Sequence, residues 1–486
     1  MSVILGINRG HDGSVCLVRN GKLEVAIATE RITRNKKERA FTEEVIDYVL
    51  NYCDLTIDDV DFIAEEDITL YLHDDNVDVR TSTVKNREIK TYIIPHQLAH
   101  CASAYYTSSF DNAYCFSMDC SYYDLNANEF QRKFNSLIAY GEGNKIYTKH
   151  CPHAMTGTLY GKVTESLGLG PALFKAGTTM GLSSYGTPFD FDFNSYTDDM
   201  KHKMDVAATV QKVLEDEVLK VLGDLGDETE NLCLSGGSFL NCNANSKVVL
   251  ESKFKKVHHF PACGDDGNSV GAALYVAHHI LDAPRYDYHH KDLCYTGSDY
   301  QSETPNYQYI AKRISEGAII GWFQGRSEFG PRALGNRSIL ADPRNFHNRE
   351  LINHVVKNRE WFRPFAPVVL EEYYQDWFDF PVPSPFMLYT AQVKQPEKIP
   401  AVTHVDNTAR FQTVTEDMNE HYYKLIKEFY SITDVPVLLN TSLNDNGKPI
   451  IETEDEAIEF LNNSHLDMMV INGNVYEKTY KWSLTK

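Results

Sequence analysis

Residues 2–28 read SVILGINRGHDGSVCLVRNGKLEVAIA, and this stretch decides the fold of the first half of the chain. Three short apolar runs, at 2–7, 14–19 and 22–28, have the length and composition of β-strands. The last two runs are separated by an Asn-Gly dipeptide, which is typical of a two-residue hairpin turn. The pattern therefore predicts a three-stranded meander at the start of the chain.

A second stretch repeats this arrangement further along the chain. Residues 113–119 (AYCFSMD) predict a strand, and residues 136–149 (SLIAYGEGNKIYTK) predict a hairpin that turns at 141–144. Each meander opens with a polar turn. Two such meanders indicate a duplicated α/β domain, the construction of actin-like ATPase folds, which hold nucleotide in the cleft between two halves.

The C-terminal part of the chain predicts a separate α/β domain. Residues 284–308 are polar and lack periodicity, which indicates a domain junction. Strand and helix signals alternate after it. We therefore expect two domains, at residues 1–290 and 305–486.

Composition and charge restrict the class of protein. The chain has 486 residues and a formal net charge of -21, so its overall field repels polyanions, and a nucleic-acid partner is disfavoured though not excluded. The N-terminus lacks the basic segment of a signal peptide, and no apolar run is long enough to span a membrane. The ten cysteines are scattered without a C-x-x-C pair, which favours buried thiols in a reducing cytoplasm. We expect a cytoplasmic monomer or homodimer.

Residues 312–363 form a basic island in this acidic chain. The stretch holds ten Lys or Arg residues against five Asp or Glu residues. Arginine binds phosphate through two parallel hydrogen bonds, and the glycines of GRSEFGPRALGNRS would let the chain wrap around a small anion. A solvated charged face is the alternative. Because Gly, Pro and apolar residues are interleaved with the arginines, we favour an anion pocket.

Two histidines at helical spacing suggest a metal site. His96 and His100 lie four residues apart and would share one helix face. Asp119 ends a predicted strand, and Asp265 lies in the turn GDDG. Two His and two Asp suit a divalent metal such as iron better than a structural zinc. The alternative is a pair of unrelated histidines.

The first turn also carries a candidate general base. His11 follows a strand in the turn NRGHDGS, with Asp12 beside it. An imidazole has a pKa near neutrality, so it can accept a proton from a hydroxyl. A turn histidine bonded to the backbone is an equally good interpretation of the residues alone.

Taken together, these motifs resemble the carbamoyltransferase family that includes the nodulation, cephamycin and tobramycin carbamoyltransferases. The matching stretches are GINRGHDGSV, HQLAHCASAYY, LSGGSFLNCNAN, GDDGNSVGAAL, GWFQGRSEFGPRALGNRSILADPR, VVKNREWFRPFAPVVL, HVDNTARFQTV and VPVLLNTSLNDNGKPI. The resemblance implies a duplicated actin-like (ASKHA) domain, similar to the one that makes threonylcarbamoyl-tRNA, followed by a YrdC-like α/β domain. It further implies that carbamoyl phosphate and ATP form carbamoyl-adenylate and pyrophosphate, and that the carbamoyl group then passes to an acceptor hydroxyl on a small molecule or sugar.

The resemblance also implies roles for individual residues. The family's metal ligands match His96, His100, Asp119 and Asp265. The histidine that deprotonates the acceptor matches His11, and we take Asp12 as the second catalytic candidate. The nucleotide-facing turn of the first domain matches Gly236, Gly237 and Asn241. The site for carbamoyl phosphate and ATP, with Mg²⁺ as a companion of ATP, matches Arg332, Lys357, Arg363, Arg410 and Ser442.

The sequence departs from the family pattern near the acceptor side. The usual Asp-Gly-x-Gly-Glu after the second meander's first strand is replaced by DCSYY at 119–123. The usual Glu-Gly-Lys before Met-Gly-Leu is replaced by AGT at 176–178. We expect these changes to alter acceptor recognition and to leave the activation chemistry intact.

Two other functions remain open at this point. A hydroxymethylated pyrimidine in viral DNA, such as 5-hydroxymethylcytosine, could be the acceptor, because a basic cluster could contact phosphates. That cluster comprises Arg31, Arg34, Lys36, Lys37 and Arg39. An actin-like metallohydrolase or a non-catalytic nucleotide-binding regulator is the other alternative. A hydrolase would need a general-base Glu beside the histidines, and a regulator would not need the arginines of the second domain.

Overall fold

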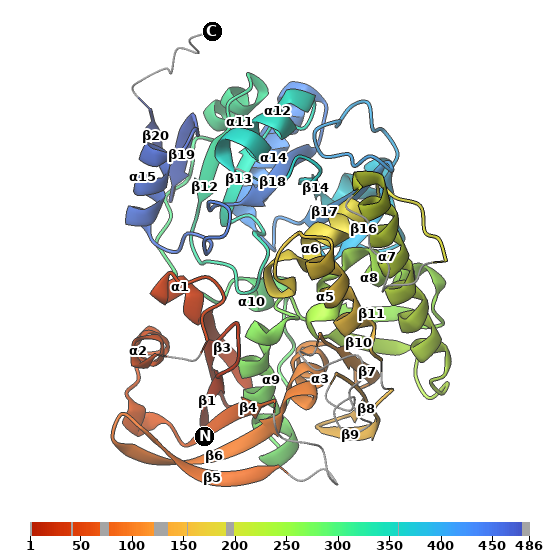
Figure 1. The fold of residues 1–486 in the computed structure, drawn as a ribbon. Helices are drawn as coiled ribbons and strands as arrows, with labels where there is room; N and C mark the ends of the chain where they lie inside the picture. The colour runs from red at the N-terminus through yellow and green to blue at the C-terminus, as the bar shows by residue number, and fades with distance from the viewer. Residues whose placement is uncertain are drawn as a thin grey trace. The chain divides into compact units, whose positions relative to one another are not determined.

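The computed structural model describes residues 2–39, 42–68, 77–120, 135–152, 154–190, 199–357 and 359–478 (Figure 1). The chain forms two compact units, Met1–Thr296 (unit 1) and Gly297–Lys486 (unit 2). Both combine sheets with helices, which confirms the predicted α/β class. Residues 121–123 of the altered loop lie outside the described residues.

The first sheet of unit 1 begins with the predicted meander. Its strand order is β3-β2-β1-β4-β6-β5. The strands are β1 Val3–Asn8, β2 Ser14–Arg19, β3 Lys22–Ala28, β4 Phe62–Asp67, β5 Asp78–Val84 and β6 Arg87–Pro95. β1, β2 and β3 are antiparallel neighbours, whereas β4 runs parallel to β1 and β6 runs parallel to β4. Asn20 and Gly21 turn the hairpin with φ angles of 53° and 83°, the left-handed backbone that an Asn-Gly turn supplies.

The second sheet repeats this topology, with strand order β11-β10-β7-β8-β9. The strands are β7 Asn112–Met118, β8 Ser136–Glu142, β9 Lys145–His150, β10 Asn231–Ser235 and β11 Lys256–His259. β7, β8 and β9 are antiparallel neighbours, whereas β10 runs parallel to both β7 and β11. The same directions in the same order confirm the duplication that the two meanders predicted.

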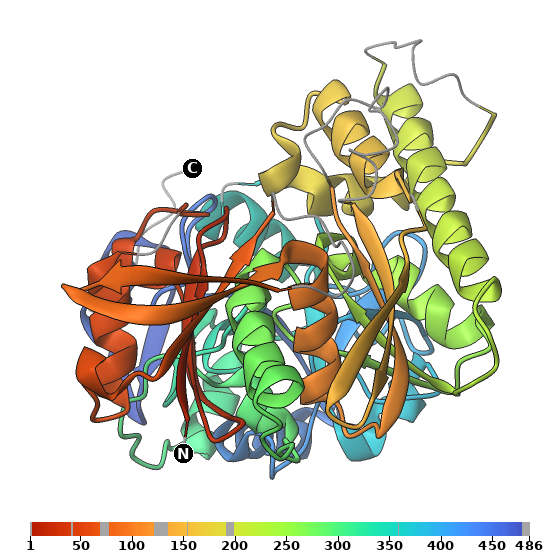
Figure 2. The ribbon, with the colours of Figure 1, turned by 90° about the horizontal axis from the view of Figure 1, so that it is seen from below.

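Two helices at corresponding places connect the halves of unit 1. Helix α3 (His96–Thr107) follows β6, and helix α9 (Asn268–Tyr275) follows β11. α3 packs mainly on β7, β8 and β10, and α9 packs on β1, β2 and β4, so each helix covers the sheet of the other half. Figure 2 shows the two helices side by side between the sheets. A Cβ at Gly271 would lie 1.9 Å from the backbone oxygen of Ala99, so this close approach requires glycine.

Shorter elements complete unit 1. The apolar side of the first sheet packs against α2 in a core that includes Leu5, Val15 and Val45. The remaining helices are α1 Thr29–Thr33, α2 Glu43–Tyr52, α5 Thr156–Ser166, α6 Ala172–Ser183, α7 Met200–Gly223, α8 Cys242–Glu251 and α10 His290–Cys294, with 3-10 turns at Ile57–Asp59, Gly237–Leu240 and Asp265–Gly267 and a π turn at Val276–Ile280.

Helix α10 lies inside the stretch that the sequence predicted to be irregular. The backbone N–H of His289 donates to the carboxylate of Asp292 at 3.0 Å, as part of a capping box. A local capping interaction starts this short helix, and hydrophobic periodicity does not reveal such a signal.

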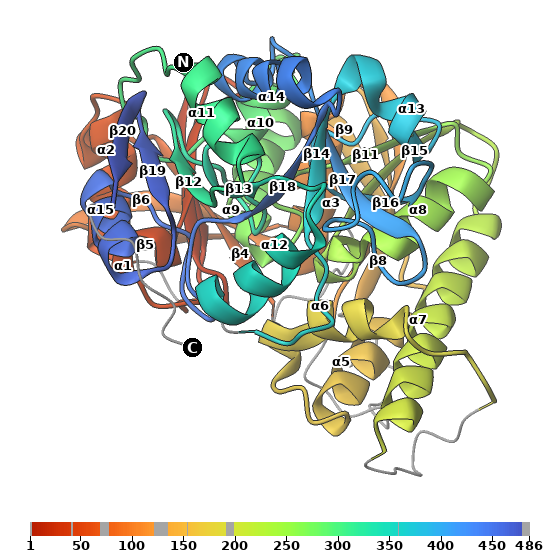
Figure 3. The ribbon, with the colours of Figure 1, turned by 90° about the horizontal axis from the view of Figure 1, so that it is seen from above.

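Unit 2 is built on one nine-stranded sheet, with order β15-β16-β17-β14-β18-β13-β12-β19-β20 (Figure 3). The strands are β12 Ile320–Phe323, β13 Arg337–Ala341, β14 Ala366–Leu370, β15 Phe378–Asp379, β16 Tyr389–Val393, β17 Thr408–Val414, β18 Val437–Ser442, β19 Met468–Ile471 and β20 Asn474–Glu477. The helices are α11 Tyr307–Ser315, α12 Phe346–Leu351, α13 Tyr374–Trp377, α14 Glu420–Thr433 and α15 Glu454–Asn463, with a π turn at Ile352–Val356 and a 3-10 turn at Glu371–Tyr373. Throughout the described parts of the chain, each helix is too short or too polar to cross a membrane.

Candidate active site

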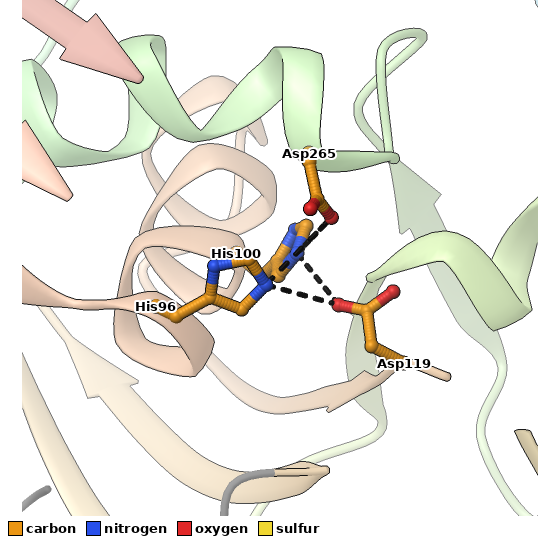
Figure 4. A group of neighbouring side chains, drawn as sticks. All are labelled: His96, His100, Asp119 and Asp265. Atoms are coloured by element: carbon orange, nitrogen blue, oxygen red, sulfur yellow. Dashed lines mark ion pairs between the residues drawn. The ribbon is translucent and has the colours of Figure 1, made fainter. Parts of the chain in front are cut away.

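Four of the predicted residues meet at one point in unit 1 (Figure 4). His96 and His100 lie one turn apart at the start of α3, Asp119 follows β7, and Asp265 begins the turn before α9. Nε2 of His100 lies 2.8 Å from Oδ2 of Asp119 and 3.4 Å from Oδ1 of Asp265. Nε2 of His96 lies 3.4 Å and 3.6 Å from the same two oxygens. One donor atom of each side chain therefore lies within 4.8 Å of the others.

The electrostatics of this cluster indicate a need for positive charge. Burial by itself lowers the pKa of His96, but the carboxylates of Asp265 and Glu66 raise that pKa well above its usual value. Burial raises the pKa of Asp119, but the His100 and His96 imidazoles hold it well below its usual value. Two buried carboxylates must be compensated by protons or by a cation. Two imidazole nitrogens and two carboxylate oxygens are a donor set that fits a divalent transition metal.

The predicted catalytic turn lies beside the cluster. Nε2 of His11 is 3.2 Å from Oδ2 of Asp265, and Nδ1 of His11 is 3.1 Å from Oδ2 of Asp12. Lys37 donates from Nζ to both oxygens of Asp12, at 2.7 and 2.9 Å. Burial opposes the charged form of His11, yet the hydrogen bond to Asp12 and the charge of Asp265 raise its pKa. The hydrogen bond from His11 and the charge of Lys37 outweigh burial and lower the pKa of Asp12 to about 2.

The glycine pair of the predicted nucleotide turn contacts the cluster directly. The backbone N–H of Gly237 donates to Oδ1 of Asp119, so Oδ2 is the oxygen that faces the histidines. Gly236 has a φ of 99°, and a Cβ there would lie 2.4 Å from the backbone oxygen of Met118. The side chain of Asn241 accepts from the N–H of Ala244 as the N-cap of α8 and exchanges hydrogen bonds with Gln211. The Gly236-Gly237 turn therefore holds Asp119 in place. The side-chain amide of Asn241 is hydrogen-bonded within the protein, to the backbone of Ala244 and to Gln211.

We predict that Gly237→Ala weakens metal binding by about tenfold, because outer partners of metal ligands have effects of this size. The added Cβ would lie 2.7 Å from Oδ1 of Asp119 and must displace that carboxylate. Gly177→Ala is the matched control, because a Cβ at this exposed position in α6 meets no atom within 4 Å. The control should bind metal normally and gain about 0.5–1 kcal/mol of unfolding free energy. Metal titration and thermal melting measure both effects, and normal metal affinity in Gly237→Ala would refute the supporting role.

Two further polar side chains reach the histidines, and the motifs did not single them out. Glu66, at the end of β4, has Oε2 2.8 Å from Nδ1 of His96. The Asn268 amide nitrogen lies 3.3 Å from Nδ1 of His96 and 3.2 Å from Nε2 of His100. The available signal for Glu66 was the run of three acidic residues, Glu65, Glu66 and Asp67, that ends β4.

The basic cluster of the DNA alternative is partly engaged within unit 1. Nζ of Lys36 lies 2.6 Å from Oε1 of Glu30, and Lys37 binds Asp12. Arg31 is buried, and Nη1 of Arg34 donates to the Arg31 backbone oxygen at 3.3 Å. Part of the basic cluster is therefore bound to other residues of unit 1.

In unit 2, predicted residues from distant parts of the chain also meet. Lys357 is buried, and its Nζ donates to the backbone oxygen of Ser442 and to the backbone and side-chain oxygens of Asn444, at 2.6 and 2.7 Å for Asn444. Ser442 ends β18 and donates from Oγ to Oδ1 of Asn444 at 2.6 Å. Lys357 and Ser442 therefore form one polar group, which also includes Asn444.

Several guanidinium groups of unit 2 lower one another's pKa. Burial lowers the pKa of Arg363, and the charge of Arg332 lowers it further, against the opposing charge of Glu360. Burial and the charges of Arg363 and Arg410 hold the pKa of Arg359 well below its usual value. Like charges that depress one another's pKa values create a local positive field, which attracts anions.

Not every arginine of the basic stretch belongs to this group. Arg337 is fully buried and donates to the backbone oxygens of Gln324, Asn336 and Gly325 at 2.9–3.1 Å. Arg344 forms an ion pair with Asp342, with a nitrogen–oxygen distance of 2.6 Å. The predicted anion pocket therefore does not include every arginine of residues 312–363, because these two are held by other partners.

A buried carboxylate shapes the loop that carries Arg332. Oε1 of Glu328 accepts from the backbone N–H groups of Leu334, Asn336 and Arg337, at 2.7, 2.8 and 3.2 Å. In the sequence, Glu328 is one of five acidic residues in the basic stretch 312–363, and its residue type does not set it apart from the others. Its three hydrogen bonds identify it as the residue that closes this loop.

Sequence comparisons identify the family. The model described as Carbamoyltransferase N-terminus matches residues 3–76, 69–198 and 190–274, and the model described as Carbamoyltransferase C-terminus matches residues 311–478. Nodulation protein NolNO of Sinorhizobium fredii is 31% identical over 96% of this chain and 79% of its own length. Nodulation protein NolO of Bradyrhizobium diazoefficiens is 34% identical over 77% of each chain. The 3'-hydroxymethylcephem-O-carbamoyltransferase of Amycolatopsis lactamdurans is 24% identical over 98% of this chain and 99% of its own length.

The two matches together cover both units of the chain, so each unit corresponds to one of the two family models. The chain belongs to the carbamoyltransferase family, and it is a carbamoyltransferase.

Proposed function

We propose that the protein is an ATP-dependent O-carbamoyltransferase that uses carbamoyl phosphate as its donor. The proposal is supported by the polar group that buried Lys357 forms with Ser442 and Asn444, and by the charges of Arg332 and Arg410, which act on neighbouring arginines of the same unit. Positive charges that act on one another within one unit favour a phosphorylated ligand, whose oxygens compensate them. One relative is named as an O-carbamoyltransferase of a hydroxymethylcephem, which supports a hydroxyl as the acceptor group.

In the activation step, carbamate derived from carbamoyl phosphate reacts with ATP. A carbamate oxygen attacks the α-phosphorus, the bond to the bridging β-phosphate oxygen breaks, and pyrophosphate leaves; Mg²⁺ bound with ATP would neutralise the charge of the leaving group. The phosphate of carbamoyl phosphate is not part of carbamoyl-adenylate, so balance requires one water molecule and the release of inorganic phosphate. Arg332, Arg363 and Arg410 bind the phosphate oxygens, and Lys357, held by Ser442, adds a point charge. The resulting mixed anhydride is a better acyl donor than a carbamate.

The transfer step is assigned to the cluster of unit 1. His96, His100, Asp119 and Asp265 would hold a divalent metal, for which iron is our candidate, and this metal would polarise the carbamoyl carbonyl. Nδ1–H of His11 donates to Asp12, and Lys37 fixes Asp12 in place. Nε2 of His11, which lies 3.2 Å from Oδ2 of Asp265, would take the proton of the acceptor hydroxyl once it is no longer hydrogen-bonded to that carboxylate. The acceptor oxygen attacks the carbamoyl carbon, and AMP leaves.

The acceptor class is a hydroxyl-bearing small molecule or sugar. The test is incubation of the protein with labelled carbamoyl phosphate, ATP, Mg²⁺ and iron against a panel of sugars, antibiotics, nucleosides and hydroxymethylated DNA. We expect label in an O-carbamoyl product, with AMP and pyrophosphate formed. Label transfer in the absence of ATP would contradict the adenylate route, and transfer to hydroxymethylated DNA alone would replace the proposed acceptor class.

We predict that His11→Asn lowers transfer to the acceptor by about 10²–10⁴-fold, the contribution of a positioned general base. Pyrophosphate release should persist, because the activation residues lie in unit 2. His347→Asn is the control, since His347 is an exposed histidine whose side chain is 84% accessible. Comparison of carbamoyl product with pyrophosphate separates the two steps. If His11→Asn transfers the carbamoyl group at the wild-type rate, His11 is not the general base and is only a turn histidine held by carboxylates.

A further inference from the structure

We propose that Glu66 is a positioning residue of the metal centre, which fixes the orientation and proton placement of His96 so that Nε2 is presented to the metal. This inference rests on the metal site of the proposed function and deepens it. Nothing in the relatives' names or in the motifs points to this carboxylate, and its role is argued from contacts in unit 1.

The backbone places Glu66 next to His96. β4 runs parallel to β6, and Glu66 pairs with Ile94, two residues before His96. β6 ends at Pro95, and α3 begins at His96. Glu66 retains 4% of its accessible surface, so its carboxylate is held away from water. Oε2 lies 2.8 Å from Nδ1 of His96, a distance typical of a charge-assisted hydrogen bond.

This contact determines which ring nitrogen faces the cluster. A carboxylate accepts a hydrogen bond, so the bond to Glu66 places the ring proton on Nδ1. In the metal-bound form, Nε2 would then offer its lone pair to a cation beside Asp119 and Asp265, whose oxygens lie 3.4 and 3.6 Å from Nε2. Metal-bound histidines commonly donate their other N–H to a carboxylate, which also makes the ligand nitrogen more basic.

The two histidines are supported differently. Nδ1 of His100 lies 3.4 Å from Oγ of Ser235, a neutral hydroxyl. His96 therefore has the anionic support, and the Glu66 charge adds to those of Asp119 and Asp265. A third carboxylate close to the centre favours a divalent cation over a monovalent one.

The turn that carries His11 also contacts Glu66. A Cβ at Gly10 would lie 3.3 Å from Oε1 of Glu66, so this turn passes over the carboxylate. One side chain thus packs against the turn of the candidate base and hydrogen-bonds a candidate metal ligand. Displacement of Glu66 is expected to disturb both.

The preceding residue supplies a matched control. Glu65 is also 4% exposed, but its Oε1 lies 2.9 Å from Nη2 of Arg80 and also binds Nε of Arg9. Glu65 and Glu66 are adjacent in one strand, and their side chains point to opposite faces of the sheet. Glu65→Gln therefore removes a buried carboxylate from the same strand without touching His96.

The experiment measures Co²⁺ affinity of the full-length protein by chelator competition and records the visible spectrum of the Co²⁺ complex. Glu66→Ala should weaken Co²⁺ binding by about 10–100-fold and shift the spectrum. Glu66→Gln keeps the acceptor oxygen without its charge, so its loss should be smaller. Glu65→Gln should match the wild type, and pyrophosphate release should be normal in all variants.

The outcomes separate this inference from the proposal beneath it. Wild-type affinity and spectrum for Glu66→Ala, with metal lost in His100→Ala, would overturn the role of Glu66 and leave the metal centre intact. Equal losses of Co²⁺ affinity in Glu65→Gln and Glu66→Gln would show that the buried charges of β4 matter only for folding. That result would also overturn the inference. If the wild type and His100→Ala bind Co²⁺ equally, the metal centre itself is wrong. If Glu66→Ala does not fold, the inference is tested instead by the visible spectrum of the Co²⁺ complex of Glu66→Gln.

Discussion

Replacement of Arg332 by alanine is expected to lower pyrophosphate release from carbamoyl phosphate and ATP by at least about 100-fold. Loss of one charged donor to a reacting phosphate has effects of this size. Arg332 lies close enough to Arg363 to depress its pKa, so the two guanidinium groups share one positive field. A coupled pyrophosphate assay measures the effect without any acceptor, which removes the transfer step from the result.

Arg344→Ala is the matched control for this experiment. Arg344 belongs to the same basic stretch, but its guanidinium is held by Asp342, with a closest distance of 2.6 Å. The control should release pyrophosphate at nearly the wild-type rate. Unchanged release by Arg332→Ala would remove this residue from the activation site, whereas an equal loss in both variants would indicate a general effect of charge.

Replacement of His100 by alanine is expected to abolish metal binding and to lower carbamoyl transfer by at least about 100-fold, while pyrophosphate release continues. His100 is fully buried, its Nε2 lies 2.8 Å from Asp119, and its removal would leave three of the four candidate ligands. Metal content, carbamoyl product and pyrophosphate are measured on the same sample.

His279→Ala is the control for the loss of a histidine from unit 1. Its ring stacks on Tyr275 with a centroid separation of 4.4 Å, and its Nδ1 accepts from the N–H of Ile146, outside the cluster. The control should retain metal and transfer. Loss of both pyrophosphate release and transfer in His100→Ala would contradict the assignment of the two steps to two sites.

The topology of unit 1 could be predicted where its signals are local. The apolar runs around Asn20-Gly21 and the repeat at 113–149 specify two meanders, because strand alternation and turn chemistry act over a few residues. The packing of α3 on the second sheet and of α9 on the first could not be predicted. That exchange depends on the contact between Gly271 and Ala99, which are far apart in the sequence.

The sequence predicted which residues belong to the candidate site better than it predicted how they are arranged. Residue types at family positions indicated His96, His100, Asp119 and Asp265, and the structure brings them together. Residue type did not distinguish Arg363 from Arg337, because both are arginines among glycines and apolar residues. The difference is that Arg337 donates to three backbone oxygens. Glu66 was missed for the same reason, since only the pairing of β4 with β6 brings it to His96.

The crossing of α3 and α9 makes a backbone contact control the spacing of the proposed metal ligands. Ala99 lies between His96 and His100 in sequence, and Gly271 follows Asp265 by less than two helical turns. Any side chain at 271 would push the helices apart and would carry the imidazoles away from the aspartate. The spacing of the candidate ligands therefore depends on Gly271, a residue that itself offers no donor atom to a metal.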